Sequence, residues 1–255
     1  MKKILHIIIA MAAALGAVSC HEVEVYDTDP HGTFEQLWTI LDTHYCFFRE
    51  KGVDWEEVHA RYAPRISDQM TREELFAVCA EMLDELRDGH TNLSAPFQTS
   101  YYRRWWSDYP QNYQARLVEQ YYFNFEYKSA GAIDYGMLPQ NIGYMRYSSF
   151  AYGIGDGNLD AILGYMATAD GVIIDVRDNG GGSMTNVETL VARFITQKTL
   201  AGSICHKTGP GHDDFSEPYA YYYYPAPEGR LLWGKPVVVL CNLSLIHISE
   251  PTRQE

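Results

Sequence analysis

The stretch Gly171–Ser183, GVIIDVRDNGGGS, decides the fold of this chain. Its first residues, Val172–Ile174, form a β-branched apolar run of the kind found in strands that are buried on both faces. The run Gly180–Gly182 then breaks the strand, and apolar residues recur at helical spacing over 186–195. A strand, a glycine turn and a helix in this order point backbone N–H groups into a cleft at the carboxyl end of a sheet. Such groups can stabilise an oxyanion in acyl transfer, and the glycines alone leave open a turn without chemistry.

The sequence around this stretch predicts a parallel sheet. A strand is expected over 142–150 and a helix over 159–169, immediately before the strand that begins near Val172. A strand, a helix and a strand in succession form a right-handed β-α-β crossover, which makes the two strands parallel. Another continuous apolar strand is expected at Val237–Leu240, and a hairpin ending at Pro225 follows a strand near 204–207. Alternation near 118–127, within an aromatic-rich region, predicts further β-strands.

Helical periodicity dominates the residues before this core. Apolar side chains recur at helical spacing from Phe34 to Phe48, and Gly52 ends that predicted element. Asp54 and Thr71 are each followed three residues later by a glutamate, which is the capping-box pattern of a helix start. These helices form one N-terminal helical subdomain.

Composition limits the partners and the chemistry. The chain has 255 residues, 46% of them hydrophobic, and a formal net charge of −13. A packed core is therefore expected, whereas nucleic acid is excluded as a partner because it requires clustered basic residues. No Cys-x-x-Cys pair is present, so neither a zinc site nor a redox pair is predicted. No metal and no cofactor are expected. We expect four free, buried cysteines in the folded part: Cys46, Cys79, Cys205 and Cys241.

The first residues have the pattern of an export signal. Lys2 and Lys3 precede an apolar run over 4–18, which ends in small residues and Cys20. A cysteine at that place resembles a bacterial lipobox, in which Cys20 receives the lipid and becomes the mature N-terminus. The sequence thus predicts a lipid-anchored protein of the bacterial cell envelope with an acidic tether over 21–30. An ordinary secretory signal with an incidental cysteine is the alternative.

Four stretches in a fixed order carry a resemblance to a known family. They are LRDGHTNL at 86–93, IGYMRYSSF at 142–150, IIDVRDNGGG at 173–182 and GKPVVVLCN at 234–242. Together they resemble the tail-specific serine proteases, the family of the C-terminal-processing peptidases and the tricorn protease core. The resemblance implies an α/β protease core and a serine-type peptidase that acts on peptides or unfolded proteins.

The resemblance also implies roles for individual residues. His90 matches the histidine that serves as general base to the serine. One of Gly180, Gly181 and Gly182 would supply the backbone N–H that holds the oxyanion, with Gly181 as the first choice. Many members of the family carry a PDZ domain between the helical part and the protease core. Too few residues separate Leu93 from Ile142 for such a domain, so none is predicted.

The nucleophile of the resembled family is missing from its expected place. Aligned on Asn242, the family serine falls at His247, and Ser244 and Ser249 lie outside that frame. Residues 243–253, LSLIHISEPTR, resemble the conceptual translation of a transposon-based sequencing adapter. We therefore expect the native sequence to end near Asn242 and this chain to be a truncated, inactive fragment. A natural but unusual C-terminus is the alternative.

The predicted fold class is α/β, or α+β overall: a helical subdomain followed by an incomplete α/β protease core with a β-α-β crossover. The predicted divisions are a lipoprotein signal peptide (1–20), a tether (21–30), a helical tricorn-like N-terminal subdomain (31–95), a partial catalytic domain (96–242) and an artefactual tail (243–255).

Two other functions stay open at this stage. A non-catalytic surface lipoprotein could bind peptides or carbohydrates through its many tyrosine and tryptophan side chains. A metal-dependent hydrolase would use His90, His206 and His212. The segment 206–214 has metal-binding residue types but no fixed ligand spacing, and we expect it to be a solvated loop.

Overall fold

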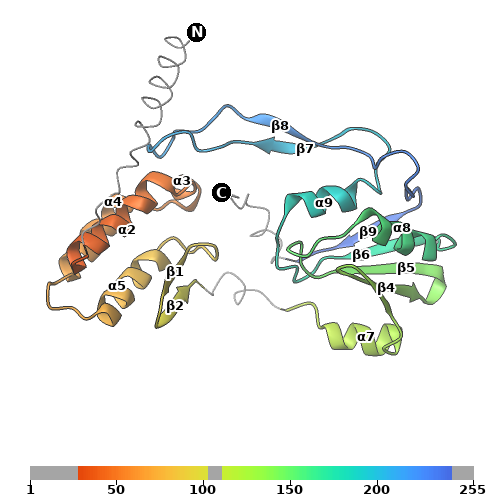
Figure 1. Cartoon of the computed structure of the whole chain (residues 1–255), viewed down its shortest axis with the longest axis horizontal. Coiled ribbons are helices and arrows are strands. Elements are labelled where there is room, and N and C mark those ends of the chain that lie inside the picture. Colours follow the sequence, from red (N-terminus) through yellow and green to blue (C-terminus); the bar gives the residue numbers. More distant parts are fainter. Residues whose placement is uncertain (1–27, 103–110, 243–255) are drawn as a thin grey trace, which may run out of the picture.

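The computed structural model describes residues 28–102 and 111–242 (Figure 1). The predicted signal peptide with Cys20, most of the tether, and the tail with His247 therefore lie outside the described residues. Within the described ranges, no helix combines the length and the apolar character needed to cross a membrane.

The helical subdomain forms the N-terminal part of the molecule (Figure 1). Its core contains Phe34, Trp55 and Met82, all almost fully buried. A short antiparallel hairpin follows its last helix. Its elements are α2 (Pro30–His44), α3 (Phe48–Lys51), α4 (Trp55–Tyr62), the 3-10 helix η1 (Ala63–Arg65), α5 (Arg72–Asp84), β1 (Asn92–Ala95) and β2 (Gln98–Tyr101).

Both predicted helix starts are confirmed. The Asp54 side chain accepts a hydrogen bond from the Glu57 N–H at 3.0 Å. Thr71 and Glu74 form the full reciprocal capping box of α5. The single helix expected from Phe34 to Phe48 is wrong, because the chain is extended at Tyr45 between α2 and α3.

The break between α2 and α3 has a packing reason. It turns Phe48 into the core of the subdomain, where its ring centroid lies 5.4 Å from that of Trp55. Gly52 then ends α3 in the left-handed conformation, with φ of 62°, as its position in the sequence predicts.

The second part of the molecule is built on a five-stranded sheet with strand order β3-β4-β5-β6-β9. The β5, β6 and β9 strands are parallel, and α8 connects β5 to β6, as the crossover predicts. The α9 helix follows β6. The elements are α7 (Ala115–Phe123), β3 (Lys128–Ala130), β4 (Ile133–Leu138), the 3-10 helix η2 (Pro139–Asn141), β5 (Ile142–Tyr147), α8 (Asp156–Tyr165), β6 (Gly171–Asp175), α9 (Met184–Val191) and β9 (Val237–Leu240).

Helices cover the two faces of this sheet. The α8 helix buries Leu159 and Ile162 against Met145 and Ile174 on one face. On the opposite face α7 packs on β4 (Figure 1), and its Phe123 ring lies against Gly136 of β4 and Tyr144 of β5. The strand β9, at the other edge of the sheet from β3, keeps its valines exposed, with Val239 at 56%.

The expected β-strands near 118–127 are wrong, because most of this region forms α7. The apolar alternation is misleading here because Tyr121 and Tyr122 face solvent, with exposed fractions of 73% and 61%. Asn124 ends the helix with a φ of 49°. The short strands β3 and β4 that follow were not expected.

An antiparallel ribbon of β7 (Thr199–Ile204) and β8 (Tyr219–Tyr223) reaches from the end of α9 to the helical subdomain (Figure 1). At its tip, His212 Nε2 lies 2.7 Å from Asp42 Oδ1, and its ring packs against Phe48 at a tilt of 36°, with centroids 4.6 Å apart. The segment 206–214, predicted to be a solvated loop, is largely exposed. Through His212 it also contacts α2 and α3 of the helical subdomain.

The cysteines confirm one part of the prediction and contradict another. All four in the described residues are free. However, only Cys79 is buried, and its burial raises the pKa of the thiol to about 11. Cys46 is half-buried, while Cys205 and Cys241 are exposed because they follow the ribbon strand β7 and the edge strand β9.

Candidate functional site

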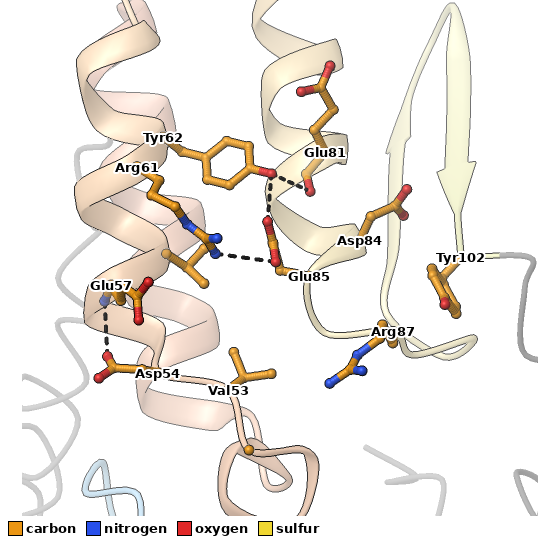
Figure 2. Close-up of a pocket in the computed structure, with 12 residues that line it drawn as sticks. Val53, Asp54, Glu57, Arg61, Tyr62, Glu81, Asp84, Glu85, Arg87 and Tyr102 are labelled. Carbon is orange, nitrogen blue, oxygen red and sulfur yellow. Dashed lines mark hydrogen bonds and ion pairs between the residues drawn. The ribbon is translucent and has the colours of Figure 1, made fainter.

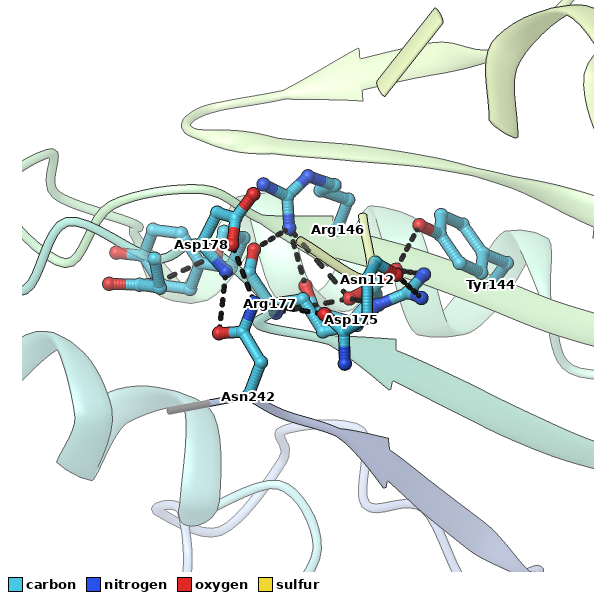
Figure 3. A network of polar contacts seen from close by, with 9 residues as sticks. Asn112, Tyr144, Arg146, Asp175, Arg177, Asp178 and Asn242 are labelled. Atoms are coloured by element: carbon cyan, nitrogen blue, oxygen red, sulfur yellow. Dashed lines mark hydrogen bonds and ion pairs between the residues drawn. The ribbon is translucent and has the colours of Figure 1, made fainter. Parts of the chain in front are cut away.

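The end of β6 is fixed by a buried carboxylate. Asp175 is fully buried and accepts hydrogen bonds from the Arg177 guanidinium, from Nε at 2.9 Å and from Nη2 at 2.5 Å. The Tyr144 hydroxyl donates a third hydrogen bond to Asp175 at 2.7 Å (Figure 3). Arg146 donates from Nη1 to the Arg177 carbonyl at 2.6 Å. This network holds the two parallel strands together where the glycine turn begins.

The same contacts determine the charge states. Burial alone would raise the pKa of Asp175, but the hydrogen bonds from Arg177 and Tyr144 outweigh it and hold the pKa below its usual range. The pKa of Arg177 is raised by its hydrogen bond with Asp175, and the pKa of Tyr144 is raised by burial and by the same carboxylate. Asp175 and Arg177 are therefore a charged pair at neutral pH.

Two asparagines continue the network around the turn. Asn242, at the end of β9, accepts from the Asp178 N–H at 3.1 Å and donates to its carboxylate at 2.5 Å (Figure 3). Asn179 is fully buried and donates to the Tyr147 carbonyl at 2.7 Å. The residues before the glycines are thus tied to β9 on one side and to β5 on the other.

The three glycine N–H groups differ in their partners. Gly180 donates to the Ser148 carbonyl at 3.1 Å, and Gly181 donates to the Asn179 side chain at 2.8 Å. Among the described residues, Gly182 is the one of the three whose N–H has no hydrogen-bond partner. A Cβ on Gly182 would lie 2.0 Å from the Ala151 nitrogen, and its φ is 138°, so only glycine fits there.

The predicted general base lies in the turn between α5 and β1. The His90 N–H donates to Asp88 Oδ1 at 2.9 Å, and the ring Nδ1 lies 3.6 Å from the same oxygen. Asp88 is buried and also accepts from the Tyr45 hydroxyl at 2.7 Å. The sequence assigns Asp88 only a turn, whereas its position allows it to orient the imidazole. In the sequence, the carboxylate of Asp88 two residues before the candidate base was the signal from which this role could have been predicted.

The candidate base and the glycine turn belong to different packing units. The α5 helix packs on β1, β2 and the other helices of its subdomain, whereas β6 packs between β5 and β9. Figure 1 shows the helical subdomain and the sheet as two separate bodies. The roles of His90 and of Gly180–Gly182 stay predictions.

The histidines of the metal-hydrolase hypothesis have other partners. His206 Nε2 lies 2.7 Å from the Tyr219 hydroxyl, and His212 contacts Asp42. In the part of the chain that the structure describes, no three His, Cys, Asp or Glu side chains are grouped to hold a metal ion. His90, His206 and His212 therefore do not converge.

A cavity of about 550 Å³ in the helical subdomain contains none of the predicted site residues (Figure 2). Two of its charged lining groups, Arg61 and Glu85, form an ion pair. Arg61 lies 3.3 Å from Glu85, which also accepts from the Tyr62 hydroxyl at 3.0 Å. We assign it no chemical role.

Comparisons with known proteins identify the family. Residues 26–84 match the tricorn protease C1 domain, and residues 141–244 match peptidase family S41. A crystal structure of a protein assigned as a peptidase from Parabacteroides merdae is 39% identical to this chain and superposes with a TM-score of 0.80. The match covers 87% of this chain and 72% of that one. The chain belongs to peptidase family S41.

Membership in family S41 confirms the resemblance to the tail-specific and tricorn-like proteases and the predicted fold class. The S41 match spans β5 to β9 and includes the whole glycine turn. The family makes the protein a serine-type peptidase in general, with peptides or proteins as substrates.

A more distant structure shares the fold alone. Mature CPAF complexed with lactacystin is 9% identical, with a TM-score of 0.55 over 84% of this chain and 79% of that one. A search of curated protein sequences found no match.

Proposed function

We propose that the intact S41 peptidase cleaves peptides or unfolded proteins in the bacterial cell envelope, where a lipid on Cys20 anchors it. Its acidic charge of −13 makes nucleic acid an unsuitable partner. His90 serves as general base, and the glycine turn holds the oxyanion. The observation that carries this proposal is the open N–H of Gly182 in a turn that hydrogen bonds hold on both sides.

The proposed reaction is acyl transfer through a serine. In the resembled family this serine follows a strand such as β9, and its hydroxyl attacks the carbonyl carbon while the histidine takes the proton. The carbonyl oxygen becomes an oxyanion, which preorganised N–H donors stabilise. The intermediate then expels the amine, which takes the proton from His90, and water hydrolyses the remaining acyl ester.

The geometry supports Gly182 over Gly181, the first choice from the sequence. The Gly181 N–H already donates to Asn179 at 2.8 Å and would have to give up that bond to receive an oxyanion. The Gly182 N–H needs no such exchange. Donors that cost no reorganisation contribute most to transition-state stabilisation.

The chain as it stands should not catalyse this reaction, because position 247 is a histidine and not a serine. A neighbouring hydroxyl such as Ser249 is displaced by two residues, too far for productive attack geometry. The decisive test is to sequence the source genomic DNA across the Asn242 codon and to express the open reading frame found there.

If the frame continues into the family serine, the full protein should degrade an unfolded protein such as reduced, alkylated lactalbumin. His90→Ala should lower the rate about 10²- to 10⁴-fold, the usual contribution of a general base. Cleavage by the chain with His247 would contradict the proposal. His59→Ala is a matched control, since His59 pairs with Glu35 in the same subdomain.

If the genomic reading frame instead encodes the present sequence after Asn242, without the family serine, a lipoprotein that binds peptides or carbohydrates becomes the better-supported function. The exposed rings of Tyr121, Tyr122 and Tyr152 favour this second candidate, with exposed fractions above 60%. Stacking on such rings is a common mode of recognition.

A further inference from the structure

A cavity of about 180 Å³ lies between α7 and the β4–β5 hairpin, on the face of the sheet opposite α8. Apolar and aromatic side chains form much of its wall, among them Val118, Phe123, Tyr127 and Tyr144. The carboxylates of Glu119 and Asp134 also line it. None of the functions assigned above uses this cavity.

The cavity shares residues with the glycine turn. Arg146 and Ser148 line it at the end of β5. The Ser148 carbonyl accepts the Gly180 N–H at 3.1 Å, and Arg146 donates to the Arg177 carbonyl at 2.6 Å. A side chain bound in the cavity would therefore belong to a peptide whose backbone passes close to the candidate oxyanion site.

The cavity wall is preformed. The Tyr144 hydroxyl is engaged by Asp175 in the polar network (Figure 3), and its ring lies 5.2 Å from that of Phe123. Phe123 in turn occupies the space where Gly136 lacks a side chain, since a Cβ there would meet the ring at 2.7 Å. The Arg146 guanidinium stacks on Tyr113 at 3.9 Å and donates from Nη1 to the turn, so these contacts hold its position in the wall.

We propose that this cavity binds one aromatic side chain of the peptide substrate, and this inference rests on the proposed peptidase function. The volume suits a single ring, because an apolar cavity of about 150 Å³ is sufficient to bind benzene. Rings such as Phe123 and Tyr144 offer edges and faces to an incoming ring. Glu119 and Asp134 disfavour acidic side chains, because two carboxylates repel when they share a site.

Direct binding tests the inference without catalysis. The chain as it stands is titrated with N-acetyl-phenylalaninamide, N-acetyl-alaninamide and N-acetyl-glutamic acid amide, and binding is followed by protein NMR shifts. We expect the phenylalanine amide to bind at least about tenfold more tightly than the alanine amide, because only its ring buries substantial apolar area. The glutamic acid amide should bind no better than the alanine amide.

Variants of α7 locate the site. Val118→Trp fills the cavity and should abolish the preference for phenylalanine, whereas Leu117→Trp, at an exposed neighbouring position, should retain it. If Val118→Trp lowers Tm, Ala115→Trp provides the same block from an exposed lining position. Equal affinities for the phenylalanine and alanine amides, or an unchanged preference in the folded blocking variants, would overturn the inference. A parent protein that binds the probe but cleaves nothing would instead contradict the proposed function.

Discussion

The turn that carries His90 and the turn that carries Gly182 are built differently. The glycine turn is tied to β5 and β9 by Asn179 and Asn242, and a buried ion pair fixes its start. The His90 turn has one buried carboxylate, Asp88, behind an imidazole that is 43% exposed. Oxyanion donors must be fixed before the reaction, whereas hydrogen bonds of a catalytic base often tighten only when substrate binds. The difference between the two turns fits the proposed roles, His90 as general base and the glycine turn as oxyanion site.

The largest expected effect comes from removing the buried charge at the start of the glycine turn. Asp175→Ala leaves Arg177 without its partner and removes the acceptor of Tyr144. Breaking a buried pair from one side costs about 3–5 kcal/mol of folding free energy. Urea unfolding measures this loss of folding free energy. The control is Asp134→Ala, which removes an exposed carboxylate on β4 and should change stability by no more than about 0.5 kcal/mol. A similar effect of both variants would contradict the importance of the network.

Gly182→Ala tests the backbone of the turn itself. The added Cβ meets the Ala151 nitrogen at 2.0 Å, and the positive φ adds strain. We expect a loss of about 3 kcal/mol, near the upper end for a strained backbone position. In the control Gly157→Ala, the Cβ meets nothing within 4 Å in the first turn of α8. Its stability should be unchanged or higher by up to about 1 kcal/mol. Equal melting temperatures of the two variants would show that the turn relaxes freely.

A smaller effect is expected in the His90 turn. Asp88→Ala removes the acceptor of the Tyr45 hydroxyl and should cost about 1–3 kcal/mol, the usual penalty for a buried polar group left unsatisfied. Tyr45→Phe in the same background should then cost little more. A double-mutant cycle in urea measures this coupling, and independent, additive losses would argue against a role for Asp88 in positioning the turn.

The smallest effect concerns pH. The folded-state pKa of Asp175 is depressed, so its stabilising contribution is complete above the unfolded pKa of about 3.9 and is lost as the pH falls through the lower folded pKa. Urea midpoints should therefore fall with acidification below about pH 4, and this part of the slope should be absent in Asp175→Asn. An identical acid slope in both proteins would assign the loss to other carboxylates.

Much of the fold could be predicted because local signals and tertiary packing agree. The capping residues Asp54 and Thr71 begin helices, and the apolar run after Gly171 is the predicted parallel strand. The α7 helix was missed because exposed tyrosines imitate the alternation of a strand. Hydrophobic periodicity indicates the type of secondary structure only where the apolar side chains face the core.

The candidate site could be predicted only in part. The glycine run is visible in the sequence, and Gly181 donates to the neighbouring side chain of Asn179. The partner of the Gly180 N–H could not be predicted, because only folding brings the Ser148 carbonyl near it. The pairing of Asp175 with Arg177 has a local signal, since residues two apart in an extended segment share a face. The docking of His212 on Asp42 joins residues 170 positions apart and has no local signal.

That docking has a kinematic consequence. The chain running from β2 into α7 gives the helical subdomain one attachment to the sheet, and the ribbon tip at His212 gives it a second. A rigid body held at one point can rotate about three axes, whereas a body held at two points turns chiefly about the line that joins them. The contact between His212 and Asp42 therefore restricts how the subdomain that carries His90 can rotate relative to the sheet.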